Sequence, residues 1–297
     1  SAAFPQLFLD NLTEITSGQK QEIEDNVRHT LLELRKFQLP NGGFGYWPGS
    51  LTVNEWGSNY AGHFLLSAEE AGYTLPLGIK DNWLKYQRSA ARNWNNSGAT
   101  QNGGYYRNYD FIQAYRLYTL ALAGKAEMGA MNRLREKSNK AAEVSWRLAA
   151  AYVLAGQTEA GQQLISGLTK TVEQYNEFGG TFGSSSRDQA MILESLVLLN
   201  EKEDAFVMLQ NISDVLNKSS WLSTQTASWS LIAAAKFANQ FYKNEAETKF
   251  EIVANGKKTD IRTKIPLVKI PVSPDNYGQI KVEYKNQGKN TGFVKVL

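Results

Sequence analysis

Residues 38–66 decide the fold, and they read QLPNGGFGYWPGSLTVNEWGSNYAGHFLL. The first half is a loop of glycine and aromatic residues, centred on Gly42-Gly43-Phe44. The second half places Trp56, Tyr60 and Phe64 on one face of a helix. Glycine turns tightly because it tolerates positive φ, and an aromatic ring can fill the end of a helix bundle. The stretch therefore predicts a helical hairpin whose loop is plugged by an aromatic side chain.

Glycine-aromatic loops of this kind recur along the chain. Gly103-Gly104-Tyr105 and Gly179-Gly180-Thr181-Phe182 each precede another helix, and Trp221-Leu222 precedes a further one without glycines. The intervals run from roughly 40 to 75 residues, about the length of one or two helical hairpins. Apolar residues at helical spacing predict helices within residues 21–37, 56–68, 79–94, 111–122, 144–155, 164–168, 192–199, 206–216 and 227–238. Left-handed caps are expected at Gly72, Gly124 and Gly156.

Hairpins of this kind either stack as an open solenoid or close into a ring. Loops that return to one rim, together with small Ala, Ser and Gly residues along several helices, favour the ring. We therefore predict a mainly α fold, an α/α toroid of helical hairpins (terpenoid cyclase/prenyltransferase-like), over residues 1–243.

The C-terminal part, residues 244–297, has a different character. Short runs of alternating or β-branched residues predict strands at 250–254, 257–264, 266–272, 279–284 and 293–297. Asn255-Gly256 is a strong hairpin turn, and Asn286-Gln287-Gly288 is a second candidate. A β segment this short buries little core by itself. We expect a partial β domain, part of a β-sandwich whose remainder lies outside this chain.

Composition excludes several kinds of site. The chain has no Cys and two His, so disulfides, thiolate metal sites, Cys nucleophiles and multi-His sites are excluded. No metal or cofactor is expected. The net charge of +3 comes from interspersed acidic and basic residues, which does not indicate nucleic acid or an anionic membrane as partner. No apolar run reaches the ~20 residues that span a bilayer. The chain lacks an initiating Met, and we expect a piece of a longer protein.

Nucleophilic and phosphate chemistry find little support. The Gly42 loop lacks the spacing of a phosphate-binding motif, and no strand precedes it. We expect His29 on a solvated helix face and His63 in half-buried packing. Ser184-Ser185-Ser186 lies in no nucleophile elbow.

Three carboxylates are the candidate catalytic residues of an alternative function, that of a carbohydrate-active enzyme. Glu55, Asp110 and Asp188 each lie near the start of a helix that follows an aromatic loop. Closed α/α rings host carbohydrate-active enzymes with acids among aromatic rings at the rim. Acids at helix starts also satisfy unpaired N–H groups and the helix dipole, and this interpretation is favoured. A carbohydrate-active enzyme and a pure protein-interaction scaffold stay open as alternatives.

A family resemblance follows from four stretches: residues 38–50, 58–66, 113–124 and 223–231. Together they resemble the thioester domain of the bacterial alpha-2-macroglobulin family, relatives of complement proteins. The resemblance covers residues 1–243 and implies that the helical domain is an α/α toroid. The C-terminal segment resembles the start of the macroglobulin-like β domain that follows it.

The resemblance also implies a reactive centre, a Cys-x-Glu-Gln thioester that acylates an attacking protease. No position here matches it, whereas residues 1–9 resemble the stretch just downstream of that motif. Either the chain begins after the motif, or its parent lacks a thioester. Complement relatives carry an activating His in the second glycine-aromatic loop. Here residues 105–110 read YYRNYD, without His, which favours a different mode of acyl transfer.

The expected function is that of a non-enzymatic domain in a bacterial broad-spectrum endopeptidase inhibitor, a protease trap with a role in host defence. The resemblance implies proteases and the remaining macroglobulin-like domains as partners. It implies a periplasmic, cell-envelope or secreted location, with membrane anchoring only through the parent's N-terminus. No catalytic residue is assigned. The candidate rim or interaction residues are Phe44, Tyr46, Trp47, Tyr105, Tyr106 and Tyr109.

Overall fold

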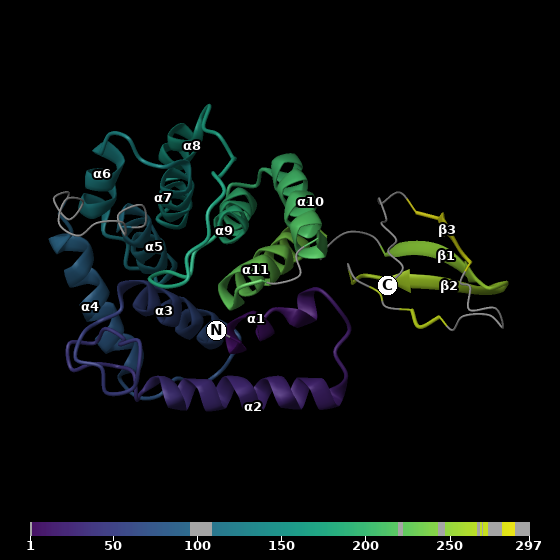
Figure 1. The fold of residues 1–297 in the computed structure, drawn as a ribbon, viewed down its shortest axis with the longest axis horizontal. Coiled ribbons are helices and arrows are strands. Elements are labelled where there is room, and N and C mark those ends of the chain that lie inside the picture. Colours follow the sequence, from purple (N-terminus) through teal and green to yellow (C-terminus); the bar gives the residue numbers. More distant parts are fainter. Residues whose placement is uncertain are drawn as a thin grey trace.

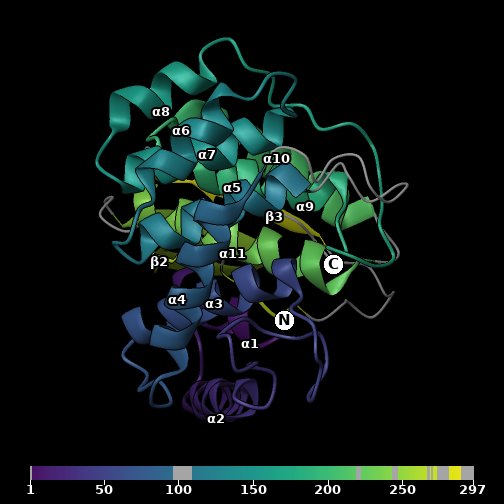
Figure 2. The ribbon, with the colours of Figure 1, turned by 90° about the vertical axis from the view of Figure 1, so that its left-hand side faces the viewer.

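The computed structural model describes residues 2–95, 109–218, 222–242, 247–265, 268, 270–272 and 281–288. Its helices alternate between an inner and an outer layer (Figures 1 and 2). The inner helices are α3 (Glu55–Glu70), α5 (Tyr109–Leu122), α7 (Ala142–Leu154), α9 (Ser185–Leu198) and α11 (Thr224–Phe241). The outer helices are α2 (Ser17–Leu34), α4 (Ile79–Asn93), α6 (Met128–Glu136), α8 (Thr158–Ile165) and α10 (Lys202–Lys218).

The inner helices contact one another in chain order, from α3 through α5, α7 and α9 to α11. The ring then closes in two ways. The N-terminal helix α1 (Ala3–Gln6) and the 3-10 turn η1 (Leu9–Asn11) contact α11, and α1 also contacts α2. The indole Nε1 of Trp56 on α3 donates directly to Gln225 Oε1 on α11, over 3.2 Å. The predicted mainly α toroid is therefore confirmed, although α1 and α6 are helices that the apolar pattern did not predict.

Helix ends follow the local sequence. The predicted left-handed caps are confirmed, with φ of 89° at Gly72, 67° at Gly124 and 77° at Gly156. The inner helices α3, α9 and α11 are capped by the preceding residues Asn54, Ser184 and Ser223, whose side chains each accept a backbone N–H of the first turn. These capped ends bring the glycine-aromatic loops to one rim, where Tyr46 of the loop before α3 stacks on Phe182 of the loop before α9 at 6.0 Å.

The C-terminal segment forms a three-stranded antiparallel sheet of order β2-β1-β3 (Figure 1). Its strands are β1 (Thr248–Ala254), β2 (Lys257–Thr263) and β3 (Val282–Asn286). Asn255 and Gly256 join β1 to β2 with φ of 47° and 77°, the two positive values of a type I′ hairpin turn. The predicted turn at Asn255-Gly256 is confirmed.

Some expectations for this segment have a different outcome. Residues 268 and 270–272 form no strand, so the strand predicted over 266–272 is wrong at these positions. Residues 293–297 lie outside the described part of the chain. The boundary between residues 243 and 244 stays a prediction, although the chain changes from helix to strand between Phe241 and Thr248. Within the residues described, no helix combines the length and the apolar character needed to cross a bilayer.

Candidate functional site

A cluster of buried charges lies between the inner helices. Glu194 on α9 is fully buried and accepts a hydrogen bond from Arg147 Nη1 on α7 at 2.6 Å. Lys236 of α11 forms a second ion pair with the same carboxylate, and Tyr118 of α5 donates its hydroxyl to it at 3.0 Å. Three inner helices therefore converge on the Glu194 carboxylate.

The cluster favours an ionised Glu194 and a protonated Tyr118. Burial opposes ionisation of Glu194, but Lys236 and Arg147 outweigh it and hold the pKa of this carboxyl below its usual range. Burial also raises the pKa of Tyr118, to about 12, so its hydroxyl stays protonated and donates. The guanidinium of Arg147 lies 4.4 Å from the ring centroid of Tyr118, a cation–π contact that adds to the ion pair.

His63 of α3 borders this cluster. It is fully buried, with Nδ1 3.1 Å from the hydroxyl of Tyr115 and Nε2 4.0 Å from Glu194. Burial lowers the pKa of His63 well below its usual value, and Lys236 lowers it further. The expected half-burial of His63 is therefore corrected to full burial. A neutral imidazole enclosed by packed rings is out of reach of any substrate, so its role is structural.

Glu55, at the rim, is held by partners. Its carboxylate accepts from the hydroxyl of Tyr86 at 2.8 Å and pairs with Arg116. Arg116 in turn donates its Nε to Gln87 of α4 at 2.9 Å. Glu55 thus ties α3 to α4 and α5 across the ring.

The other two carboxylates are also paired. Arg187 donates to Asp188 at 2.7 Å and Tyr175 donates to the other oxygen, while burial raises the pKa of Asp188. Asp110 pairs with Lys137 at 2.6 Å. Each carboxylate therefore has its own basic partner, which favours the structural interpretation over acid–base catalysis. Among the described residues, His, Asp and Glu form no group of three suited to a metal ion.

The aromatic loop residues divide into plugs and exposed groups. Phe44 is 1% exposed, and its backbone N–H donates to Ser58 Oγ at 2.8 Å, so it plugs the bundle as the loop pattern predicts. Its ring is buried in this structure, and its role as a rim or interaction residue stays a prediction. Tyr46 and Trp47 are 45% and 68% exposed. Tyr109 is half-buried and stacks on Trp94 at 6.1 Å. Tyr105 and Tyr106 lie outside the described residues.

Comparison with known proteins gives a consistent result. No protein-family model matches the chain. The chain is 26% identical over 266 residues to the alpha-2-macroglobulin of Escherichia coli strain K12, a match that covers 84% of this chain and 16% of that protein. It is 27% identical over 207 residues to the alpha-2-macroglobulin of Xylella fastidiosa, covering 65% of this chain and 12% of that protein.

Solved structures share the fold. The E. coli alpha-2-macroglobulin structure from domain MG7 to the C-terminus has a TM-score of 0.70 at 21% identity, covering 96% of this chain and 43% of that one. A Salmonella alpha-2-macroglobulin structure has a TM-score of 0.72 at 21% identity, covering 96% of this chain and 18% of that one. The chain resembles the bacterial alpha-2-macroglobulins. The resemblance predicted from the sequence is confirmed, and the chain spans about one sixth of the curated E. coli alpha-2-macroglobulin it matches.

Within this alpha-2-macroglobulin-like helical ring, the residues that join the inner helices do not stand out in the sequence motifs. Arg147, Glu194 and Lys236 are single charges in otherwise apolar or small-residue stretches, a signal that could have pointed to buried ion pairs. Their pairing was not predictable, because the partners lie far apart in sequence. His29 is exposed on α2, as expected.

Proposed function

We propose that this chain is a non-enzymatic helical region, with part of a β domain, of a larger bacterial alpha-2-macroglobulin-like protein that traps proteases. The carrying observation is the match of 84% of the chain to 16% of the E. coli alpha-2-macroglobulin. Solved structures of the E. coli protein are described as activated by trypsin and by porcine elastase. These descriptions support proteases as the targets of the parent. The remaining macroglobulin-like domains of that parent are further proposed partners.

In this proposal the helical ring supplies a rigid frame, and any thioester belongs to another part of the parent protein. The chain itself has no Cys to form a thioester. A Salmonella relative is described as reacted with methylamine, a small amine nucleophile. A parent with a Cys-x-Glu-Gln motif would acylate the trapped protease, and a parent without it would trap without a covalent bond. We further propose, from the resemblance alone, that the parent acts in host defence in the periplasm, at the cell envelope or outside the cell, and that it is anchored through its own N-terminus.

The rim residues form the interaction surface of this proposal. Tyr46 and Trp47 are exposed beside the start of α3, and Phe178 is 85% exposed in the loop before α9. The stacking of Tyr46 on Phe182 places both loops at the same rim. Exposed aromatic rings grouped this way are typical of protein contact sites. Tyr105, Tyr106 and Tyr109 stay proposed members of the same surface.

The test uses the full-length parent protein. It is incubated with trypsin or porcine elastase, and protease activity is then measured on a large protein substrate and on a small chromogenic peptide. A trap abolishes cleavage of the large substrate and spares the small one. A protease that stays freely active on the large substrate contradicts the proposal. Denaturing electrophoresis then shows whether a covalent adduct forms and whether methylamine prevents it.

The rim is tested by Tyr46→Ala with Trp47→Ala in the same protein, with Leu77→Ala as the matched control. Leu77 is 98% exposed in the connection from α3 to α4. Weaker trapping in the rim variant alone supports a contact role for these rings. Equal trapping by both variants removes the rim from the proposal. Turnover of a glycan that is lost on Glu55→Ala, Asp110→Ala or Asp188→Ala would instead favour the carbohydrate-active enzyme.

A further inference from the structure

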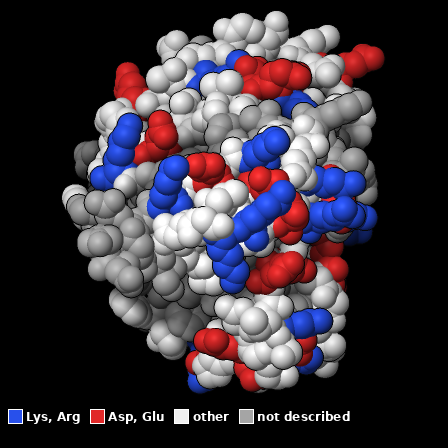
Figure 3. All heavy atoms as spheres, turned by 90° about the vertical axis from the view of Figure 1, so that its right-hand side faces the viewer, with Lys and Arg blue, Asp and Glu red and all other residues white. Residues whose placement is uncertain are grey.

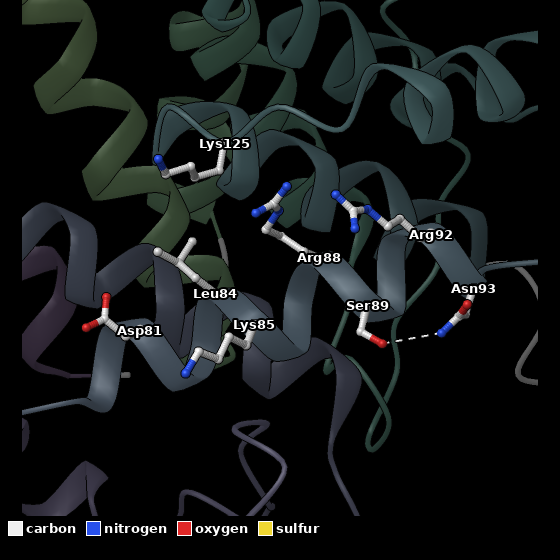
Figure 4. A pocket seen from close by; sticks show the side chains of 8 residues that line it. All are labelled: Asp81, Leu84, Lys85, Arg88, Ser89, Arg92, Asn93 and Lys125. Atoms are coloured by element: carbon white, nitrogen blue, oxygen red, sulfur yellow. Dashed lines mark hydrogen bonds between the residues drawn. The ribbon is translucent and has the colours of Figure 1, made fainter.

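A basic groove runs along the outer face of α4. It encloses about 580 Å³ and is lined by Asp81, Leu84, Lys85, Arg88, Ser89, Arg92, Asn93 and Lys125. Four of these residues are cations, and Asp81 is the one lining acid. Figure 4 shows Arg88 and Arg92 reaching toward the turn between α5 and α6 that carries Lys125, with Lys85 lower on α4 and Leu84 between.

The frame behind the groove is fixed. The inner side of α4 buries Trp83, whose indole donates to the backbone oxygen of Ser58 at 2.8 Å, and Gln87, whose amide donates to Asn59 at 2.9 Å. These contacts fix the rotation of α4 about its own axis, so its basic side chains lie on the outer face. Gly124, with φ of 67°, lets the N–H of Lys125 bond to the oxygen of Leu120 at 2.8 Å, which fixes the turn on the other side.

The groove already binds one carboxylate, that of Glu127. Arg92 donates to its two oxygens at 2.8 and 2.9 Å, and Arg88 donates at 2.6 Å. Burial opposes ionisation of Glu127, but both arginines outweigh it and lower its pKa. Within the described part of the chain, Lys85 and Lys125 have no ion-pair partner. These two lysines are exposed and leave the groove with a surplus of positive charge.

The face drawn in Figure 3 is different, because basic and acidic side chains are interspersed there. We propose that the α4 groove is a docking site for an acidic polypeptide segment, with carboxylates paired to Lys85 and Lys125 and an apolar contact on Leu84. The ion pairs of Glu127 with Arg88 and Arg92 are internal to the chain, and they show how basic side chains on this face pair with a carboxylate. None of the eight lining residues is aromatic, so bases and sugar rings find no stacking surface. This docking site is independent of the protease-trap proposal.

The test measures fluorescence anisotropy of a fluorescein-labelled peptide of alternating Glu and Gly, titrated with the full chain. The variant is Lys85→Glu with Lys125→Glu. Its matched control is Lys20→Glu with Lys249→Glu, which changes the net charge equally at exposed sites on α2 and β1. We expect binding that weakens about tenfold in the groove variant and with added salt, but not in the control. Thermal unfolding checks that both variants stay folded.

Three results overturn the proposal. The first is no binding of the acidic peptide by the wild-type chain. The second is an equal loss in the groove variant and the control, which indicates nonspecific attraction. The third is a sulfated oligosaccharide that displaces the peptide and binds more tightly, which assigns the groove to a polyanionic glycan. A gain of binding to a peptide of alternating Lys and Gly by the groove variant would support the charge pairing directly.

Discussion

The inner and outer helices of the ring differ in how much of their surface is buried and in which residues they bury. The inner helix α9 buries almost its whole length, including Arg187, Asp188 and Glu194, whereas the outer helix α2 buries Val27 and Leu31 and exposes most of its other faces. An outer helix needs a single apolar stripe. An inner helix has neighbours on all sides, so any charge it carries must find its partner inside the protein. The inner layer is therefore expected to depend on buried ion pairs, and the outer layer on one apolar stripe and on helix caps.

The largest expected effect comes from removing the shared carboxylate of the inner ring. Glu194→Ala leaves Arg147 buried without its partner and leaves Lys236 unpaired. Breaking a buried pair costs about 3–5 kcal/mol of unfolding free energy. The measurement is urea-induced unfolding followed by circular dichroism. Glu203→Ala on α10 is the control, because this exposed acid should change the value by less than about 0.5 kcal/mol. Equal losses of unfolding free energy in Glu194→Ala and Glu203→Ala would contradict a special role for buried ion pairs in the inner layer.

A second substitution tests how closely the layers approach. A Cβ on Gly62 of α3 would overlap the indole of Trp83 on α4, whereas a Cβ on Gly129 of α6 would meet nothing within 4 Å. Gly62→Ala should therefore cost about 1–3 kcal/mol by overpacking. Gly129→Ala should raise stability by up to about 1 kcal/mol, because alanine favours the helix. Thermal melts of the two variants check the opposite signs, and a harmless Gly62→Ala would contradict close packing here.

The buried His63 of inner helix α3 and the exposed His29 of outer helix α2 allow the two layers to be compared by the pH dependence of stability. The unfolded chain protonates His63 below its ordinary pKa of 6.5, but the folded chain keeps it neutral because burial lowers its pKa. Unfolding free energy should therefore fall by about 1 kcal/mol from neutral pH to about pH 5.5. Glu194 has a lowered pKa, so its contribution is lost only as pH falls below its ordinary 4.5, outside this window.

The matched variants are His63→Gln and His29→Gln, measured by urea unfolding at both pH values. The first should flatten the slope between the two pH values. The second should leave it unchanged, because His29 is exposed on α2. A slope that survives His63→Gln would assign it to another group.

The smallest effect is expected at an outer helix end. Thr16 caps α2 by accepting the N–H of Gln19 at 3.3 Å, and Gln19 accepts the N–H of Thr16 at 3.0 Å. Thr16→Ala should cost about 1 kcal/mol, and Thr16→Ser should restore it. Chemical denaturation of the two variants checks this. A Thr16→Ala loss as large as that of Glu194→Ala would mean that the outer layer is not held mainly by local rules.

Local sequence patterns are sufficient to predict the helical character, the loops and the caps. Apolar spacing predicted α3 and α4, and glycine marked the left-handed ends at Gly72 and Gly124. These features need a few neighbouring residues, so a local pattern is sufficient to predict them. The resemblance to alpha-2-macroglobulins came from the same local stretches.

The pairing of the buried charges depends on the folded arrangement of the helices and cannot be read from local patterns. Glu194 joins Arg147, which is 47 residues away along the chain, and Lys236, which is 42 residues away. Glu55 and Asp188, which looked alike in sequence, differ because Asp188 is buried and the side chain of Glu55 is 43% exposed. The physical reason is that an ion pair depends on the distance between its atoms in space, and closure of the ring sets that distance.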